Sequence, residues 1–248
     1  MTPDWLESLA TASIALAFLC AAIILVMLLA RPQKMAIMNV VWPVTALYWG
    51  PVGVWGLWDM GSPPVSPTKR MEQELQQERR KLEKKRGQDK KKEGQDEDKP
   101  SKPFWQQVAV GVTHCGAGCT LGDIIGEWLV FAFGWKLFGD KLYAEFLVDF
   151  PLAFLLGIGF QYATIAPMRG LGLKDGIIAA LKADTISIVA FEVGLFGWMA
   201  LDAFVLFPGE SIATWNHWFQ MQIGMIVGFF TSYPANVFLF DKGLKEAM

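Results

Sequence analysis

Long apolar blocks separated by short polar breaks dominate this chain and predict a bundle of membrane-spanning helices. The first block covers residues 5–30, which is long enough to cross a bilayer because a crossing helix needs about 20 residues. Four more apolar blocks follow a charged stretch, at approximately residues 104–135, 146–168, 176–207 and 215–240. Only helices and closed barrels satisfy every backbone group in lipid, so we expect an all-α, polytopic membrane protein.

A further apolar block, residues 35–58, permits two interpretations. Its length of roughly 24 residues is enough for one crossing. Pro43 and Gly50-Pro51 interrupt it, and such breaks also suit a re-entrant hairpin. We prefer one crossing, which predicts an integral membrane helical bundle of about six spans. Five spans plus a re-entrant segment is the alternative.

Charges between the apolar blocks orient the bundle, because cytoplasmic loops carry an excess of lysine and arginine. Residues 61–103 are rich in both signs of charge and predict a cytoplasmic linker, largely disordered or helical. With the linker inside, the C-terminus is cytoplasmic and Lys136 and Lys141 lie outside. Arg31 and Lys34 conflict with six spans, since both would then lie outside. The side of the N-terminus therefore stays open.

Composition supports this class and argues against others. Hydrophobic residues make up 53% of the 248 residues, which is too many for an ordinary soluble domain. We divide the chain into an N-terminal membrane hairpin (1–60), the linker (61–103) and a four-helix membrane core (104–248). Three cysteines indicate no disulfide framework, and nothing beyond the linker suggests nucleic-acid binding. Familiar enzyme signatures are absent from the sequence, which disfavours an enzyme.

Residues 113–127 concentrate reactive side chains within one apolar block. At four-residue steps the sequence places a polar stripe on one helix face: Cys115, Cys119, Asp123 and Glu127. Beside it runs a ridge without side chains, which allows another membrane helix to approach closely: Gly118, Gly122 and Gly126. This stretch is the first candidate for a functional site, and ordinary helix packing is the competing interpretation of its glycines.

Two later blocks carry groups that can reach the same depth. Asp184 and Glu192 are eight residues apart, so they lie near one face of a helix, and Met221 and Met225 lie in the last block. A charged side chain costs about 2.5–3.5 kcal/mol at the centre of a bilayer, so such groups normally face a cavity, a partner or an ion. Counting about 1.5 Å per residue, these groups can meet His114 near the midplane.

Imidazole, thiolate and thioether groups together form the soft ligand set that favours copper(I). We therefore expect a copper(I) centre built from His114, Cys115 and Cys119 and completed by Met221 or Met225. His114 and Cys115 point about 100° apart on a regular helix, so joint ligation requires the glycines to loosen the backbone. The alternatives are buried inert thiols, packing methionines, or a redox-active disulfide in a broken helix.

Several short runs carry a resemblance to a known family: Ile37-Met38-Asn39-Val40-Val41-Trp42-Pro43, His114-Cys115 with Gly118-Cys119, Phe191-Glu192-Val193-Gly194, and Ser232-Tyr233-Pro234-Ala235-Asn236. These runs resemble the bacterial membrane family catalogued as domain of unknown function 4396. The resemblance covers nearly everything except the first span and the linker. It implies a multi-pass protein of the bacterial inner membrane, with the family's His-Cys and Cys positions at His114, Cys115 and Cys119. It supplies no mechanism.

Three functional hypotheses follow. The leading one is a non-enzymatic membrane protein that binds or transports a soft metal ion, copper(I), through the membrane core. The second is an accessory or scaffolding subunit, whose partners are other subunits of a larger membrane complex or further copies of this chain. The third is a thiol redox protein that uses Cys115 and Cys119.

Overall fold

The computed structural model describes residues 3–61, 75, 79 and 103–245. The expected linker at 61–103 lies almost wholly outside these residues. Within the described part, the regular elements are helices, and the one β-type contact is an isolated bridge between Leu137 and Asp140. The predicted all-α class is therefore confirmed.

Five helices among the described residues are long and apolar enough to cross a membrane, which makes the chain a helical membrane protein. They are α1 (Asp4–Ala30), α5 (Phe104–Phe133), α6 (Lys141–Arg169), α7 (Leu173–Leu201) and α8 (Trp215–Asp241). A π-helical turn, η1 (Asp202–Leu206), continues α7. The four helices of the expected core are all present, and α1 matches the first apolar block.

The second apolar block is not a span, which corrects our preference for six crossings. It forms two short helices, α2 (Met38–Trp49) and α3 (Pro51–Met60). They meet at Gly50, whose φ of 53° lies in a region that suits glycine and turns the chain back before Pro51. An added Cβ at Gly53 would lie 3.1 Å from Ala46, so α3 packs against α2. The block is a helical hairpin, as in the alternative interpretation.

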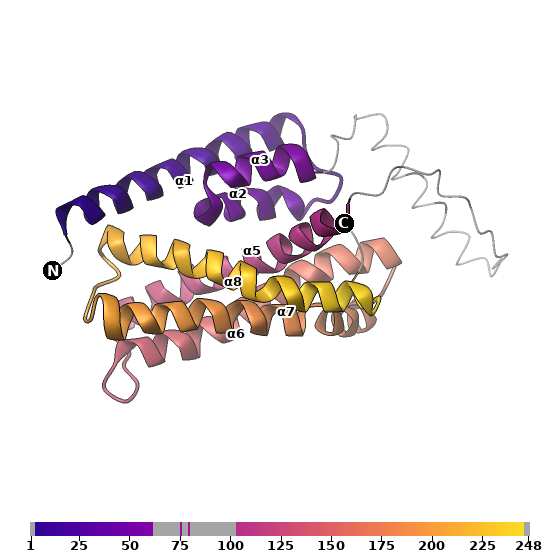
Figure 1. Cartoon of the computed structure of the whole chain (residues 1–248). Helices are drawn as coiled ribbons and strands as arrows, with labels where there is room; N and C mark the ends of the chain where they lie inside the picture. Colours follow the sequence, from indigo (N-terminus) through magenta and orange to yellow (C-terminus); the bar gives the residue numbers. More distant parts are fainter. Residues whose placement is uncertain (1–2, 62–74, 76–78, 80–102, 246–248) are drawn as a thin grey trace.

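The hairpin removes the conflict between the charged loops. Asp59, at the end of α3, accepts a hydrogen bond of 2.8 Å from Gln106 at the start of α5, so the hairpin returns to the end where α5 begins. Figure 1 shows that this end also holds the connection after α1, the α6–α7 turn and the C-terminus. We term it the inner end. The opposite, outer end holds the N-terminus and the connections at 134–140 and 207–214.

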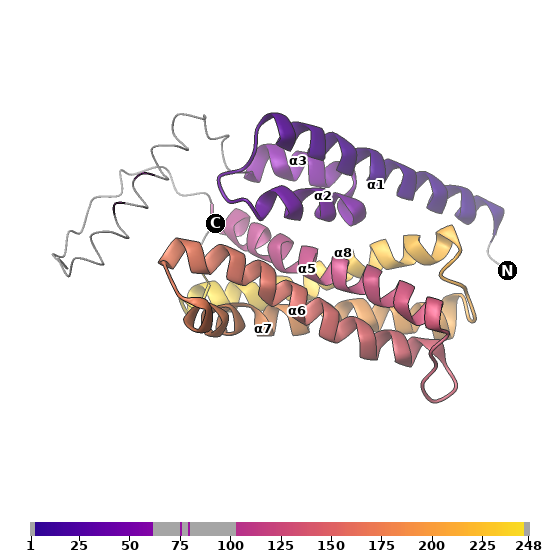
Figure 2. The ribbon, with the colours of Figure 1, turned by 180° about the vertical axis from the view of Figure 1, so that it is seen from behind.

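Helix α5 is the centre of the bundle. Of its most apolar window, 83% is buried, against 39% for each of α6, α7 and α8. It packs against α2, α6, α7 and α8, while α1 packs on α2, α3 and α8. Figure 2, from behind, shows α5 and α6 lying side by side along the bundle. The polar side chains of α5 between Thr113 and Glu127 are consequently buried inside the bundle.

The glycine ridge of α5 lies against α6. A Cβ added to Gly118 would lie 2.6 Å from the Cα of Gly157, and one added to Gly122 would collide with the backbone of Ala153. A Cβ at Gly126 would collide with the carboxyl group of Asp149. Backbone therefore meets backbone along this interface, as small residues permit in membrane helix pairs.

We expect the substitution Gly122→Ala to destabilise the protein by about 1–3 kcal/mol, because the added methyl group must push α5 and α6 apart. Gly159→Ala is the matched control on α6, since a Cβ there meets nothing within 4 Å. Thermal unfolding of the purified protein in detergent measures the difference. Equal melting temperatures for the two variants would contradict the close packing.

The hairpin also predicts the side of the N-terminus. With α1 as one span and the hairpin returning to the same side, Arg31, Lys34 and the linker share the cytoplasm, and the N-terminus lies outside. Exposed positions are available at both ends: Trp5 and Lys136 at the outer end and Lys174 at the inner end.

In intact cells, we expect a membrane-impermeant thiol reagent to label Trp5→Cys and Lys136→Cys, and to label Lys174→Cys only after permeabilisation. The native cysteines are buried and give little background. Labelling of Trp5→Cys only after permeabilisation would instead support six crossings.

Candidate functional site

His114 and Cys115 face different neighbours, because α5 stays a regular helix through the glycines. The Nε2 atom of His114 lies 3.4 Å from the hydroxyl group of Thr164 on α6, and its ring packs edge-on against Phe160. Cys115 and Cys119 lie in the main apolar cluster instead. The loosened backbone that joint ligation requires is not present, so the structure does not bring His114 to the two thiols.

The sulfur atoms of the predicted site do share one region. The thiols of Cys115 and Cys119 interact directly, and Met221 and Met225 belong to the same buried cluster. The hydroxyl group of Thr120 lies 3.5 Å from the sulfur of Met225. Among the described residues, no group of three or more histidine, cysteine, aspartate or glutamate side chains is arranged to hold a metal. All three cysteines are free, and α5 is a continuous helix through Cys115 and Cys119.

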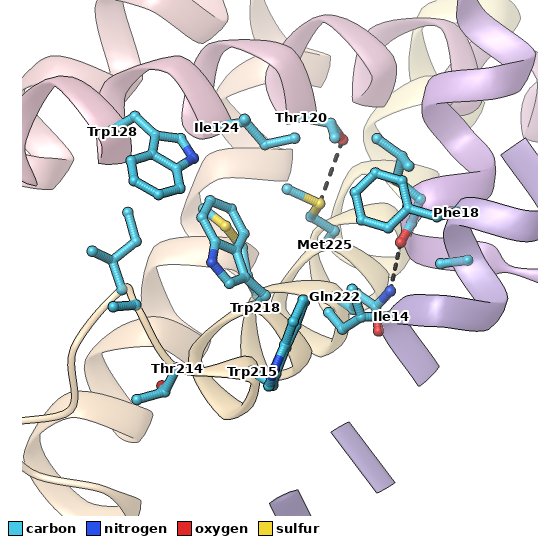
Figure 3. Close-up of a pocket in the computed structure, with 15 residues that line it drawn as sticks. Ile14, Phe18, Thr120, Ile124, Trp128, Thr214, Trp215, Trp218, Gln222 and Met225 are labelled. Carbon is cyan, nitrogen blue, oxygen red and sulfur yellow. Dashed lines mark hydrogen bonds between the residues drawn. The ribbon is translucent and has the colours of Figure 1, made fainter. Parts of the chain in front are cut away.

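Met221 and Met225 also line an apolar cavity of about 410 Å³ between α1, α5 and α8. In Figure 3 the rings of Trp128 and Trp218 form one side of this cavity, and Phe18 of α1 forms another. Gln222 donates a hydrogen bond of 2.6 Å to the carbonyl oxygen of Leu47, which ties the tip of the hairpin to α8. Asp123 and Glu127, the acidic members of the polar stripe on α5, do not line this cavity.

Five buried acidic side chains form a row between α5, α6 and α7. Asp123 and Glu127 of α5 meet Asp149 and Glu145 of α6 and Glu192 of α7, and neighbouring members interact electrostatically. Each of the five is at most 2% exposed. The thiol of Cys119 lies beside Glu192 at the deep end. We call this set the acidic row.

The acidic row begins at a polar cavity at the outer end. This cavity has a volume of about 230 Å³ and is lined by Lys141, Glu145, His217 and Asp202, the last carried by the π-helical turn. Lys141 lies 3.2 Å from Glu145, and its side chain is 37% exposed, whereas that of Glu145 is 3% exposed. His217 lies 3.4 Å from Glu127. The row therefore leads from a partly solvated entrance into the bundle.

Deeper in the row, the carboxyl groups are short of partners. Within the described residues, both oxygens of Asp123 and Oδ1 of Asp149 have no hydrogen-bond partner, and the weakly donating thiol of Cys119 is the polar group beside Glu192. Unpartnered ionised carboxylates are too costly in such a place, so these groups carry protons or face a cation or water.

A second polar region, separate from the row, lies toward the inner end. The ammonium group of Lys245 donates hydrogen bonds to Asp184 at 2.6 Å, to Asn236 at 2.8 Å and to the carbonyl oxygen of Gly111 at 3.0 Å. Asn236 in turn donates to the hydroxyl group of Ser187 at 2.6 Å. Asp184 and Glu192 therefore belong to different clusters, although both are buried on α7.

Sequence reasoning missed several of these residues. Asp149 and Glu145 were overlooked, although two acids four residues apart at the start of an apolar block signal a buried face. His217 is 3% exposed, and its position beside Glu127 depends on the packing of α8 against α5. Asp184 pairs with Lys245, which is distant from it in sequence. Only the folded chain reveals that pairing.

Helices α5 to α8 and both polar clusters lie in one region of the chain that matches a protein family. Residues 104–245, which comprise α5 to α8 and every residue of the two polar clusters, match the family described as Domain of unknown function (DUF4396). The chain belongs to this family. No curated protein and no solved structure gave a match. Within the DUF4396 region lie Cys115, Cys119 and the complete acidic row, so any function of these groups belongs to the family domain rather than to α1 or the hairpin.

Proposed function

We propose that this protein moves protons across a bacterial inner membrane through the interior of α5, α6, α7 and α8. The observation that supports this proposal is the acidic row, which leads from a polar outer cavity to the buried carboxyl groups of Asp123 and Glu192. Side chains that gain and lose protons within a membrane protein characteristically form such relays. The cytoplasmic side is then the inner end, where the lysine and arginine residues gather.

The energetics favour protons over a permanently ionised row. Five carboxylates at insertion costs of about 2.5–3.5 kcal/mol each would strain the bundle, and their mutual repulsion would add to that cost. A proton on most of them removes both penalties. Lys141 and His217 supply positive charge only at the outer part, within ion-pair distance of Glu145 and Glu127. Protons can therefore enter at the outer cavity and bind, one to each carboxyl group, at the deeper members of the row.

An apolar layer separates the acidic row from the inner polar region. Ile188 and Phe191 are fully buried between Asp184 and Glu192 on α7. Phe191 fills space that Gly116 of α5 leaves open, since a Cβ there would lie 2.9 Å from its ring. Such a layer prevents a continuous leak, and a small movement of α7 would be needed to pass a proton across it.

We expect Glu192→Gln to lower proton flux by about 100-fold, because glutamine has the same size but cannot exchange a proton. Purified protein in liposomes with a trapped pH-sensitive dye, driven by a potassium diffusion potential, gives the rate. Asp175→Asn, at an exposed position of the same helix, is the matched control and should retain the flux.

A Glu192→Gln variant that keeps both its melting temperature and its flux would refute the relay. Wild-type protein that carries no more protons than empty liposomes would refute the proposal itself and favour the accessory-subunit alternative. Stoichiometric partner chains in gently solubilised membranes would then identify the complex.

Copper(I) binding is a second candidate, supported by the sulfur atoms that share the buried cluster. The direct contact of Cys115 with Cys119, and the position of Met225 beside Thr120, leave a thiolate and thioether set without His114. Soft ligands of this kind suit copper(I). This candidate is compatible with the proton proposal, because the thiol of Cys119 lies next to Glu192.

Elemental analysis tests this second candidate. Protein purified from copper-supplemented cells should carry about one copper per chain, and the Cys115→Ser, Cys119→Ser variant should carry none. His114→Ala and Cys20→Ser should retain the metal, because His114 faces α6 and Cys20 lies on α1. Background copper in the wild-type protein would end this candidate.

A further inference from the structure

The inner polar region has the geometry of a cation site rather than of a simple ion pair. Oxygen atoms from three helices converge on one point: the carbonyl oxygen of Gly111 from α5, the carboxylate of Asp184 from α7 and the amide oxygen of Asn236 from α8. The ammonium group of Lys245 occupies that point. A lysine ammonium is a compact positive charge with three donors, so it satisfies the same oxygen atoms as a small inorganic cation.

Surrounding residues orient the amide oxygen of Asn236 without Lys245. The amide nitrogen of Asn236 donates to the hydroxyl group of Ser187 at 2.6 Å and to the hydroxyl group of Ser232 at 3.1 Å, which turns its oxygen toward the site. Ser232 also donates to the carbonyl oxygen of Ser187 at 2.9 Å. The amide oxygen of Asn236 is therefore oriented by residues of α7 and α8, independently of the lysine.

One oxygen at this site remains unused. Asp184 is fully buried, its Oδ1 atom accepts from Lys245, and its Oδ2 atom has no hydrogen-bond partner within the described residues. A metal cation can use both oxygens of a carboxylate, whereas the ammonium group here uses one. Carboxylate, amide and backbone carbonyl oxygens are the ligands that hard cations take in membrane proteins.

The charge of the site selects a monovalent cation. Asp184 supplies one negative charge, and Lys245 neutralises it with one positive charge. A divalent ion would leave a net positive charge buried in the bundle, which is costly without a second carboxylate. Glu192 is eight residues away on α7, about 12 Å along the helix axis, and does not share the site.

Lys245 lies on the short segment that follows α8. Helix α8 ends at Asp241, and the chain turns back at Gly243, whose φ is 64°. Leu244 and Lys245 donate hydrogen bonds of 3.0 and 3.2 Å to the carbonyl oxygen of Leu239, and residues 242–244 are exposed. The backbone hydrogen bonds of residues 242–245 all go to residues 238–240 of α8, and the side chain of Lys245 links this segment to α5 and α7.

We propose that Gly111, Asp184 and Asn236 form a binding site for a monovalent alkali-metal cation, and that Lys245 is its tethered competitor. Binding of the cation releases the lysine side chain toward the cytoplasmic surface, and loss of the cation allows the lysine to return. The site would couple cation occupancy to the position of the C-terminal segment. It lies apart from the acidic row, so the inference stands independently of proton transfer.

Thermal unfolding of the purified full-length protein tests the site. Sodium or potassium chloride replaces choline chloride at constant ionic strength, so that the screening of protein charges by salt stays the same. In choline, Lys245→Met should melt below the wild type, and sodium or potassium should raise its melting temperature by about 3 °C or more. The wild type should respond less, because its own lysine fills the site.

Two further variants separate the site from general salt effects. Lys242→Met, three residues away on the exposed part of the same segment, should behave as the wild type does. Adding Asp184→Asn to Lys245→Met should abolish the cation response, because the carboxylate is lost. Glu192→Gln should leave the response of Lys245→Met unchanged, which distinguishes this site from the acidic row.

A Lys245→Met variant that folds but responds to sodium and potassium no more than Lys242→Met would overturn the inference. If Lys245→Met does not fold, acetylation of the wild-type protein decides instead. Sodium or potassium should then raise acetylation of Lys245 about twofold or more relative to Lys242, as the displaced amine becomes accessible. Equal acetylation of Lys245 in sodium, potassium and choline would overturn the inference as well.

Discussion

Contact between the backbones of α5 and α6 is the constraint on which the rest of this structure depends. Gly118 and Gly122 let the two helices approach until Gly157 and Ala153 touch them. At that separation, Asp123 and Glu127 of α5 are buried and lie against the acids of α6. The acidic row is thus a consequence of helix packing, and a wider interface would admit lipid or water between the same residues.

The interior contains two polar regions of opposite character. Toward the outer end, carboxyl groups face one another, and oxygens of Asp123 and Asp149 are left without partners among the described residues. Toward the inner end, Lys245 donates hydrogen bonds to three oxygens, and the one from Asn236 is oriented by the hydroxyl groups of Ser187 and Ser232. Phe191 and Ile188 keep the two apart. An apolar layer of this kind is a barrier between the two polar regions.

The sequence was sufficient for the helical membrane class, because long apolar blocks leave the backbone few alternatives in lipid. It was insufficient for residues 35–58, where length favoured a crossing and the Gly50-Pro51 turn decided otherwise. The polar stripe of α5 was predictable from four-residue spacing. The orientation of His114 away from the thiols, and the pairing of Asp184 with Lys245, were not, because both depend on which helices become neighbours.

The hydrogen bond between Asp59 and Gln106 has a consequence for how such a chain can change over time. The charged linker leaves the membrane part and returns to it at nearly one point, so its ends are already joined by the folded helices. The entropy of closing a loop grows slowly with length, by about 0.6 kcal/mol for each doubling. Long insertions at this point are therefore nearly neutral for the fold, and whole new segments can be acquired there without disturbing the interior.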